Sequence, residues 1–151
     1  MSVGGQDAVS LSVESSEECA QHKGKHSGSR LQTKLYECAV GQLTIYIQLV
    51  KLKQSCFLWI GDQRKCLDNL TVALPNPFEA PPLASSILDR RPADSIGMND
   101  ESRRLAMKLS KKLGAQVFVS YTVDSPPEVD VISVVEKFLF DALRSGDTFT
   151  L

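Results

Sequence analysis

Hydrophobic and polar residues alternate along much of the chain with the two-residue period of β-strands. Between residues 43 and 49 every odd position is aliphatic, which predicts a strand with one buried face. A polar stretch then leads into the apolar residues 56–60, so we expect the two strands to form an antiparallel hairpin. Further strands are predicted at residues 68–74 and 116–123, and an edge strand at 83–88.

The second strand of the predicted hairpin is apolar on both faces. Cys56, Leu58 and Ile60 alternate with Phe57 and Trp59. A sheet covered on one side only would leave the two aromatic rings in water, so we predict that both faces of this strand are covered.

Two helices are predicted from their capping residues and apolar stripes. The first is expected to begin at Asn99 or Asp100 and to end before Gly114, which suits a left-handed C-terminal position. Its buried stripe comprises Leu105, Ala106, Leu109 and Leu113. The second is expected to begin with Ser125 as its N-cap and Pro126 at its first helical position, and to end at about residue 145.

The order of these elements predicts an α+β fold, with a mainly antiparallel β-sheet meander packed with two α-helices in β…β-α-β-α order. Residues 75–82 contain four prolines and are expected to form a stiff extended loop. Residues 1–30 are rich in Ser and Gly and lack aromatic residues, which predicts a disordered N-terminal tail. The folded domain is therefore predicted to span residues 31–151.

The composition is that of an ordinary globular protein. The chain has 151 residues, of which 42% are hydrophobic and 23% charged, and its formal net charge is −1. A protein that binds nucleic acid or an anionic membrane with its whole surface would carry a large positive excess. The apolar run at 56–60 is far shorter than the roughly 20 residues of a membrane-spanning helix. We therefore expect a cytosolic or nuclear protein that binds no membrane.

The sequence offers no catalytic motif. Its two histidines, His22 and His26, lie in the predicted tail, and no common phosphate-binding or zinc-protease signature is present. Helix capping and the helix dipole account for the acidic residues Asp124, Glu128 and Asp130. We therefore expect a protein that is not an enzyme and needs no cofactor.

One string has residue types that bind zinc. Cys19, His22 and His26 lie at reachable spacings, and Cys38 could supply a fourth ligand. The string lacks a CxxC pair, so a disordered tail without metal is the preferred interpretation. The cysteines are expected to be free thiols, as in a reducing compartment.

The first predicted helix carries a basic stripe opposite its apolar stripe. The stripe comprises Arg103, Arg104, Lys108, Lys111 and Lys112. Such a stripe is commonly only solvated, but it could contact an acidic protein surface or, as an alternative function, serve an RNA-binding module built on the 100–113 helix. The near-neutral net charge argues against nucleic acid as the partner.

The predicted sheet and helices do not obviously bury three of the aromatic side chains. Phe57 and Trp59 oppose another apolar face, and Phe140 lies off the main stripe of its helix. Exposed aromatic rings are typical centres of protein–protein interfaces, although for each single residue a core position is the preferred interpretation. We predict Phe140 and the basic stripe as partner contacts.

Three strings in order resemble the proteasome assembly chaperone 4 family. They are FLWIG at residues 57–61, LDNLTVAL at 67–74, and residues 105–112 running into QVFVSY at 116–121. The likeness extends over about residues 43–143, and none of the strings is a catalytic motif.

The resemblance implies a non-enzymatic chaperone that forms a heterodimer with proteasome assembly chaperone 3. Such a protein binds proteasome alpha-type subunits and promotes assembly of the alpha ring of the 20S proteasome, without ATP or metal. An apolar face would then bind the partner chaperone, and the basic stripe would bind the client subunit reversibly. Residues 1–30 and 75–82 differ from the family pattern, so no contacts are transferred to them.

Overall fold

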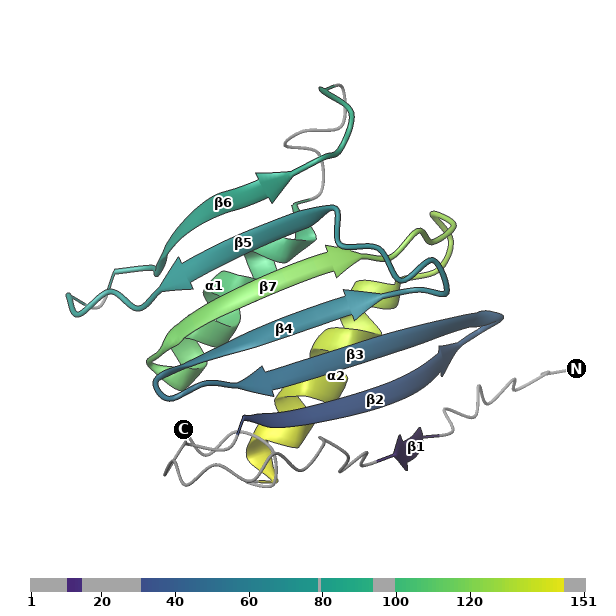
Figure 1. Cartoon of the computed structure of the whole chain (residues 1–151), viewed down its shortest axis with the longest axis horizontal. Coiled ribbons are helices and arrows are strands. Elements are labelled where there is room, and N and C mark those ends of the chain that lie inside the picture. Colours follow the sequence, from purple (N-terminus) through teal and green to yellow (C-terminus); the bar gives the residue numbers. More distant parts are fainter. Residues whose placement is uncertain (1–10, 15–30, 79, 94–99, 146–151) are drawn as a thin grey trace, which may run out of the picture.

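The computed structural model describes residues 11–14, 31–78, 80–93 and 100–145. These residues form one sheet with two helices packed on the same face of it (Figure 1). The strands are β1 (Leu11–Glu14), β2 (Gln32–Val40), β3 (Leu43–Lys51), β4 (Ser55–Gly61), β5 (Asn69–Leu74), β6 (Leu83–Asp89) and β7 (Gln116–Thr122). The helices are α1 (Glu101–Leu113) and α2 (Val131–Arg144).

The strands of the described residues lie in the order β1-β2-β3-β4-β7-β5-β6. Neighbouring strands are antiparallel except β4 and β7, which run parallel. The predicted α+β class, the hairpin of β3 with β4 and the edge position of β6 are confirmed. The sheet is mixed rather than purely antiparallel.

The prediction of a continuous meander is wrong at one point, because β4 and β5 are not neighbours. Strand β7 lies between them, with Val119 opposite both Leu58 of β4 and Thr71 of β5. Strand β7 suits a central position because its inward valines, Val117 and Val119, are fully buried and Phe118 points to the other face. Strand pairing of this kind depends on contacts between distant segments, which local periodicity does not report.

Two strands near the N-terminus were not predicted. Strand β2 buries only Tyr36 and Cys38, so its alternation is a weak signal. Strand β1 pairs with β2, which differs from the tail prediction for residues 11–14, because the free edge of β2 can bond any extended backbone. The rest of the predicted tail, with the Cys19-His22-His26 string, lies outside the described residues.

The core lies between the helices and the inner face of the sheet. In Figure 1 both helices pass behind the sheet, α1 near β5 and β7, and α2 behind β2, β3 and β4. The rings of Tyr36 on β2 and Phe138 on α2 meet edge to face, with their centroids 5.2 Å apart. The largest fully buried side chains are Ile45, Ile47, Leu58, Ile60, Leu105, Leu109, Leu139, Val117, Val119, Val131 and Val135.

Helix α1 has the predicted ends and buried stripe. The Asp100 side chain accepts a hydrogen bond from the Arg103 amide at 3.1 Å, and Gly114 adopts the left-handed conformation with φ of 61°. Leu105 and Leu109 are fully buried, and Leu113 packs at the margin of the core. No helix in the described part of the chain is long and apolar enough to cross a membrane.

Helix α2 begins later than predicted. Its N-cap is Asp130, which accepts a hydrogen bond from the Ser133 amide at 3.2 Å, so the prediction of Ser125 as the cap is wrong. Residues 126–129 form a turn instead, closed by the Val129 amide on the Pro126 carbonyl. The reason is steric, because Pro127 disfavours the helical conformation of the residue that precedes it.

The FLWIG string is explained by the packing of Trp59 on Gly61. The two residues share one face of β4, and a Cβ at position 61 would overlap the Cζ2 atom of the indole ring. The indole Nε1–H donates to the Cys66 carbonyl at 2.8 Å, which fixes the ring in this place. Glycine is therefore required at position 61 by a close approach.

We predict that Gly61→Ala lowers the free energy of unfolding by about 1–3 kcal/mol, the usual cost of overpacking. Urea denaturation followed by circular dichroism measures this. In a Trp59→Ala background the new methyl group meets no ring, so the same substitution should cost less. Equal costs in both backgrounds would show that the Trp59 contact is not the cause.

Candidate protein-interaction surface

The sheet face opposite the helices, here called the open face, carries an apolar row. Val50 of β3, Phe57 of β4, Phe118 of β7 and Val72 of β5 are successive cross-strand partners. Their sequence neighbours point into the core, so alternation places these four side chains on the open face, where each is half-buried. No helix of the described residues crosses this face (Figure 1).

The prediction that both faces of β4 are covered is therefore wrong for Phe57. Both helices pack on the other face of the sheet (Figure 1), and Phe57 stays partly exposed on the open face. Complete burial of a Val or Phe side chain stabilises an assembly by about 1.5–3 kcal/mol. A row of four such residues is consequently a strong candidate for contact with another protein.

One end of the open face is covered by the chain itself. The loop of residues 62–68, here called the covering loop, passes over Trp59 and accepts its indole hydrogen bond at Cys66. The Thr122 hydroxyl donates to the same carbonyl at 2.7 Å, and the Lys65 ammonium lies 5.4 Å from the centroid of the Tyr46 ring. Trp59 is thus part of the domain's own packing, whereas no helix in the described part of the chain covers the apolar row.

Asp62 holds the covering loop in place. Its carboxylate accepts hydrogen bonds from the Arg64 amide and guanidinium and, at 2.9 Å, from the Asp124 amide. Arg64 also donates to the Thr122 carbonyl at 3.2 Å. Burial acts to raise the pKa of Asp62, but the hydrogen bonds from Arg64 and Asp124 outweigh it and hold that pKa below its usual value.

The basic stripe lies on the outer side of α1. Two of its members are engaged within the protein: Arg104 pairs with Glu101 at 3.3 Å, and Lys108 pairs with Glu136 of α2. The other three, Arg103, Lys111 and Lys112, are exposed. Helix α1 lies on the side of the sheet opposite the apolar row (Figure 1). Arg103, near its start, lines a small hollow with Leu74, Pro82 and Leu83 at the β5–β6 edge.

Phe140 lies on the helix side of the molecule, apart from the apolar row. Its side chain is partly buried and packs against the core cluster. Its role as a partner contact, like that of the basic stripe, stays a prediction. The strongest interaction candidates that the sequence did not single out are Val50, Val72 and Phe118.

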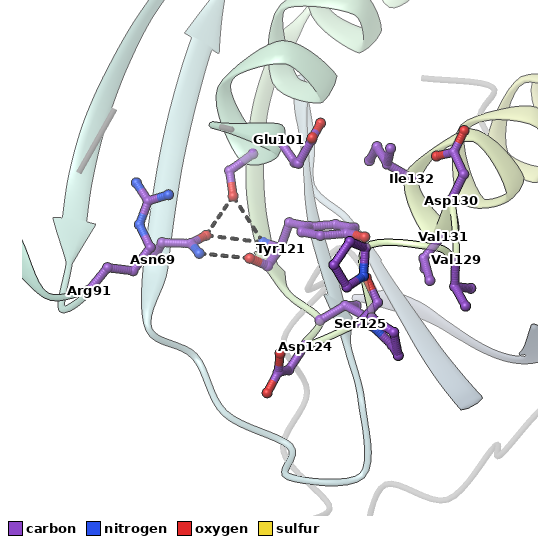
Figure 2. Close-up of a pocket in the computed structure, with 14 residues that line it drawn as sticks. Asn69, Arg91, Glu101, Tyr121, Asp124, Ser125, Val129, Asp130, Val131 and Ile132 are labelled. Carbon is purple, nitrogen blue, oxygen red and sulfur yellow. Dashed lines mark hydrogen bonds between the residues drawn. The ribbon is translucent and has the colours of Figure 1, made fainter. Parts of the chain in front are cut away.

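A pocket of about 450 Å³ opens where the N-termini of α1 and α2 approach the end of β7. Figure 2 shows the ring of Tyr121 within it and Asn69 at its side. The Asn69 side chain donates to the Tyr121 carbonyl at 2.7 Å and accepts from the Tyr121 amide at 3.0 Å, while Ser102 donates to Asn69. These hydrogen bonds connect β5, β7 and α1.

The acidic groups of the pocket include residues at the N-termini of the two helices. Asp130 caps α2, and Glu101 lies in the first turn of α1 and pairs with Arg104. Burial raises the pKa of the Tyr121 hydroxyl, and the charges of Glu101 and Asp130 raise it further. Neither histidine nor cysteine is among the residues that line the pocket. Of the acidic residues for which the sequence predicted a role at the start of α2, Asp130 is the N-cap, whereas Glu128 is exposed and Asp124 donates its backbone amide to Asp62.

Two of the described cysteines, Cys38 and Cys56, belong to the core, whereas Cys66 is partly exposed. Burial raises the pKa of Cys38, and it raises that of Cys56 to about 12, so both thiols stay protonated at neutral pH. Within residues 11–14, 31–78, 80–93 and 100–145, no three Cys, His, Asp or Glu side chains are grouped to hold a metal ion.

The fold defined by these features is that of the proteasome assembly chaperones. A chain from the crystal structure of a novel chaperone complex for yeast 20S proteasome assembly superposes with a TM-score of 0.54 at 18% sequence identity. The superposition covers 76% of this chain and 96% of the yeast chain, which shows the shared fold.

Sequence comparison identifies the family. Residues 44–123 match the profile of the proteasome assembly chaperone 4 family. Over 82 residues the chain is 33% identical to proteasome assembly chaperone 4 of Homo sapiens and 32% identical to that of Mus musculus. The aligned stretch covers 54% of this chain and 60% of each relative. The chain belongs to the proteasome assembly chaperone 4 family, as its sequence strings indicated.

We predict that Asp62→Asn destabilises the protein at neutral pH by about 1–2 kcal/mol, because it weakens charge-assisted hydrogen bonds. The folded-state pKa of Asp62 lies below its unfolded value of about 3.9, so its contribution is complete above that pH and disappears as the pH falls through the folded pKa. Urea denaturation at pH 7 and pH 3 measures the difference.

The gap in stability between wild type and Asp62→Asn should therefore narrow at pH 3. Glu128→Gln removes an exposed carboxylate of the same charge and serves as the control. A gap that is constant with pH would contradict the assigned role of the Asp62 carboxylate.

Proposed function

We propose that the protein is a non-enzymatic chaperone that pairs with proteasome assembly chaperone 3 and binds proteasome alpha-type subunits while the 20S alpha ring forms. The observation that carries the proposal is the apolar row of Val50, Phe57, Phe118 and Val72, on a sheet face that no helix among the described residues covers. Membership in the family supports an assembly role, and the uncovered face supplies the surface for a partner.

The open face suits a second chaperone of the same fold. Two sheets that pack face to face bury the side chains of both inner surfaces in a layer about 10 Å thick. A stable pair of this kind buries roughly 1,200 Å² or more in total. Such packing would leave the helices of both subunits on the outside.

The client subunit is assigned to the basic stripe on α1. The exposed cations Arg103, Lys111 and Lys112 can attract an acidic protein surface from the side opposite the apolar row. A largely electrostatic contact in water is weak and salt-sensitive, which suits a chaperone that must leave the completed ring. An RNA-binding role for the same stripe is the alternative.

We also propose that the protein acts in the cytosol or nucleus. Cys38, Cys56 and Cys66 are free thiols among the described residues, as is usual in a reducing compartment.

Coexpression with proteasome assembly chaperone 3, followed by size-exclusion chromatography with and without alpha-type subunits, tests the proposal. A one-to-one complex that captures an alpha-type subunit is expected. A folded chain that stays monomeric beside both proteins would refute the proposal, and salt-sensitive retention of RNA would then favour the alternative.

We predict that Phe57→Lys abolishes the complex with proteasome assembly chaperone 3 while the variant stays folded. The new ammonium group remains hydrated in the monomer but would be buried without a counter-charge in the complex. Glu128→Gln, which changes the net charge by the same one unit at an exposed position, is the matched control. Normal pairing by folded Phe57→Lys would exclude the open face as the interface.

Replacement of all five basic-stripe residues by Gln is predicted to weaken capture of the alpha-type subunit and to reduce its salt dependence. Binding of proteasome assembly chaperone 3 should change little, because α1 lies on the opposite side of the sheet from the apolar row. Pull-down of the subunit at several salt concentrations measures the effect. Unchanged capture and salt dependence would show that the client binds elsewhere.

A further inference from the structure

Exposed apolar side chains gather at one end of β5 and β6. Leu74 and Leu83, which are 44% and 67% exposed, face each other across the two strands. Leu74 follows Val72 by two residues on β5 and so shares the open face with it. Between the two leucines, the connecting loop presents Phe78 with 87% of its surface exposed. The exposed leucines thus extend the apolar row to the base of this loop.

The loop that carries Phe78 is restrained before any partner binds. Pro75 and Pro77 fix the backbone angle φ at their positions. The Phe78 amide donates to the Asn76 side chain at 3.0 Å, which closes a local turn around Pro77. Pro82 is buried where the loop returns to β6. The phenylalanine is therefore held on a stiff support, so that its binding loses less conformational entropy than binding by a flexible loop.

The composition of the loop indicates the chemistry of its partner. Among residues 74–83 only Glu79 is charged. The loop itself therefore offers little charge, although Arg103 of α1 lines a hollow with Leu74, Pro82 and Leu83 at its base. An exposed aromatic ring flanked by exposed leucines fits an apolar pocket on another protein.

We propose that Phe78 is an anchor that inserts into an apolar pocket at the rim of the partner chaperone's sheet. The inference rests on the proposed function. Leu74 and Leu83 continue the apolar row, so the protein that binds the row is also the one expected to receive Phe78. The loop extends beyond the ends of the neighbouring strands (Figure 1), so it can reach past the sheet-to-sheet contact. The pair would then be held both by its two open faces and by this lateral contact.

Isothermal titration of proteasome assembly chaperone 3 with the full-length chain tests the anchor. Phe78→Ala is expected to weaken binding by about 10- to 100-fold, the effect of losing an interface hot spot. Its unfolding in urea should match that of wild type, since the ring is almost entirely exposed. Asn76→Ala, which frees the loop but keeps the ring, should weaken binding by a smaller factor. Lys137→Ala, an exposed change on α2, is the control.

Phe57→Lys is measured in parallel so that the two hypotheses can fail separately. Loss of binding by Phe57→Lys with wild-type affinity for Phe78→Ala would overturn the anchor and leave the proposed function intact. Reduced capture of the alpha-type subunit by Phe78→Ala, with unchanged affinity for the partner chaperone, would assign the loop to the client and also overturn the anchor. If the wild-type chain does not bind the partner chaperone, both proposals fail.

Discussion

The backbone pairing of β7 with β4 on one side and β5 on the other is the interaction on which the rest of the structure depends. It joins the β2-β3-β4 and β5-β6 segments into one sheet. The same pairing lines up Phe57, Phe118 and Val72 across three strands, and it places α1 behind β5 and β7. Asn69 and Ser102 reinforce it through their hydrogen bonds to Tyr121 at the end of β7. Without this insertion the apolar row would be divided between two separate sheets.

Because both helices pack on one face of the sheet, the two sides of the molecule differ in polarity and exposure. The inner face is buried under α1 and α2, so its side chains stabilise the monomer. The open face keeps its apolar row half-exposed, while the outer side of α1 carries cations. Apolar contact is strong and insensitive to salt, whereas contact between exposed charges is weaker and reversible. This separation is what an assembly factor needs if it is to keep one partner and release another.

The part of the chain that matches the family is also the part that carries both surfaces. Residues 44–123 include all four members of the apolar row and the whole of α1. The covering loop and Asp62, whose hydrogen bonds hold it, lie within these residues as well. Helix α2 lies beyond them and contributes mainly to the core, through residues such as Val135 and Leu139. The family match is therefore concentrated where the candidate interaction surfaces lie. The alignment with each mammalian relative covers 60% of that relative.

The sequence by itself determined most elements and the α+β class, because their signals are local. The alternation of Leu43 to Leu49, the cap at Asp100 and the left-handed Gly114 each act within a few residues, and each is found in the structure. Strand order and surface exposure required the tertiary structure, because they depend on which distant segments meet. Nothing near Phe57 in the chain indicates that β7 will lie beside it or that both helices will pack on the opposite face. Whether an apolar side chain belongs to the core or to an interface is decided only when the helices have taken their positions.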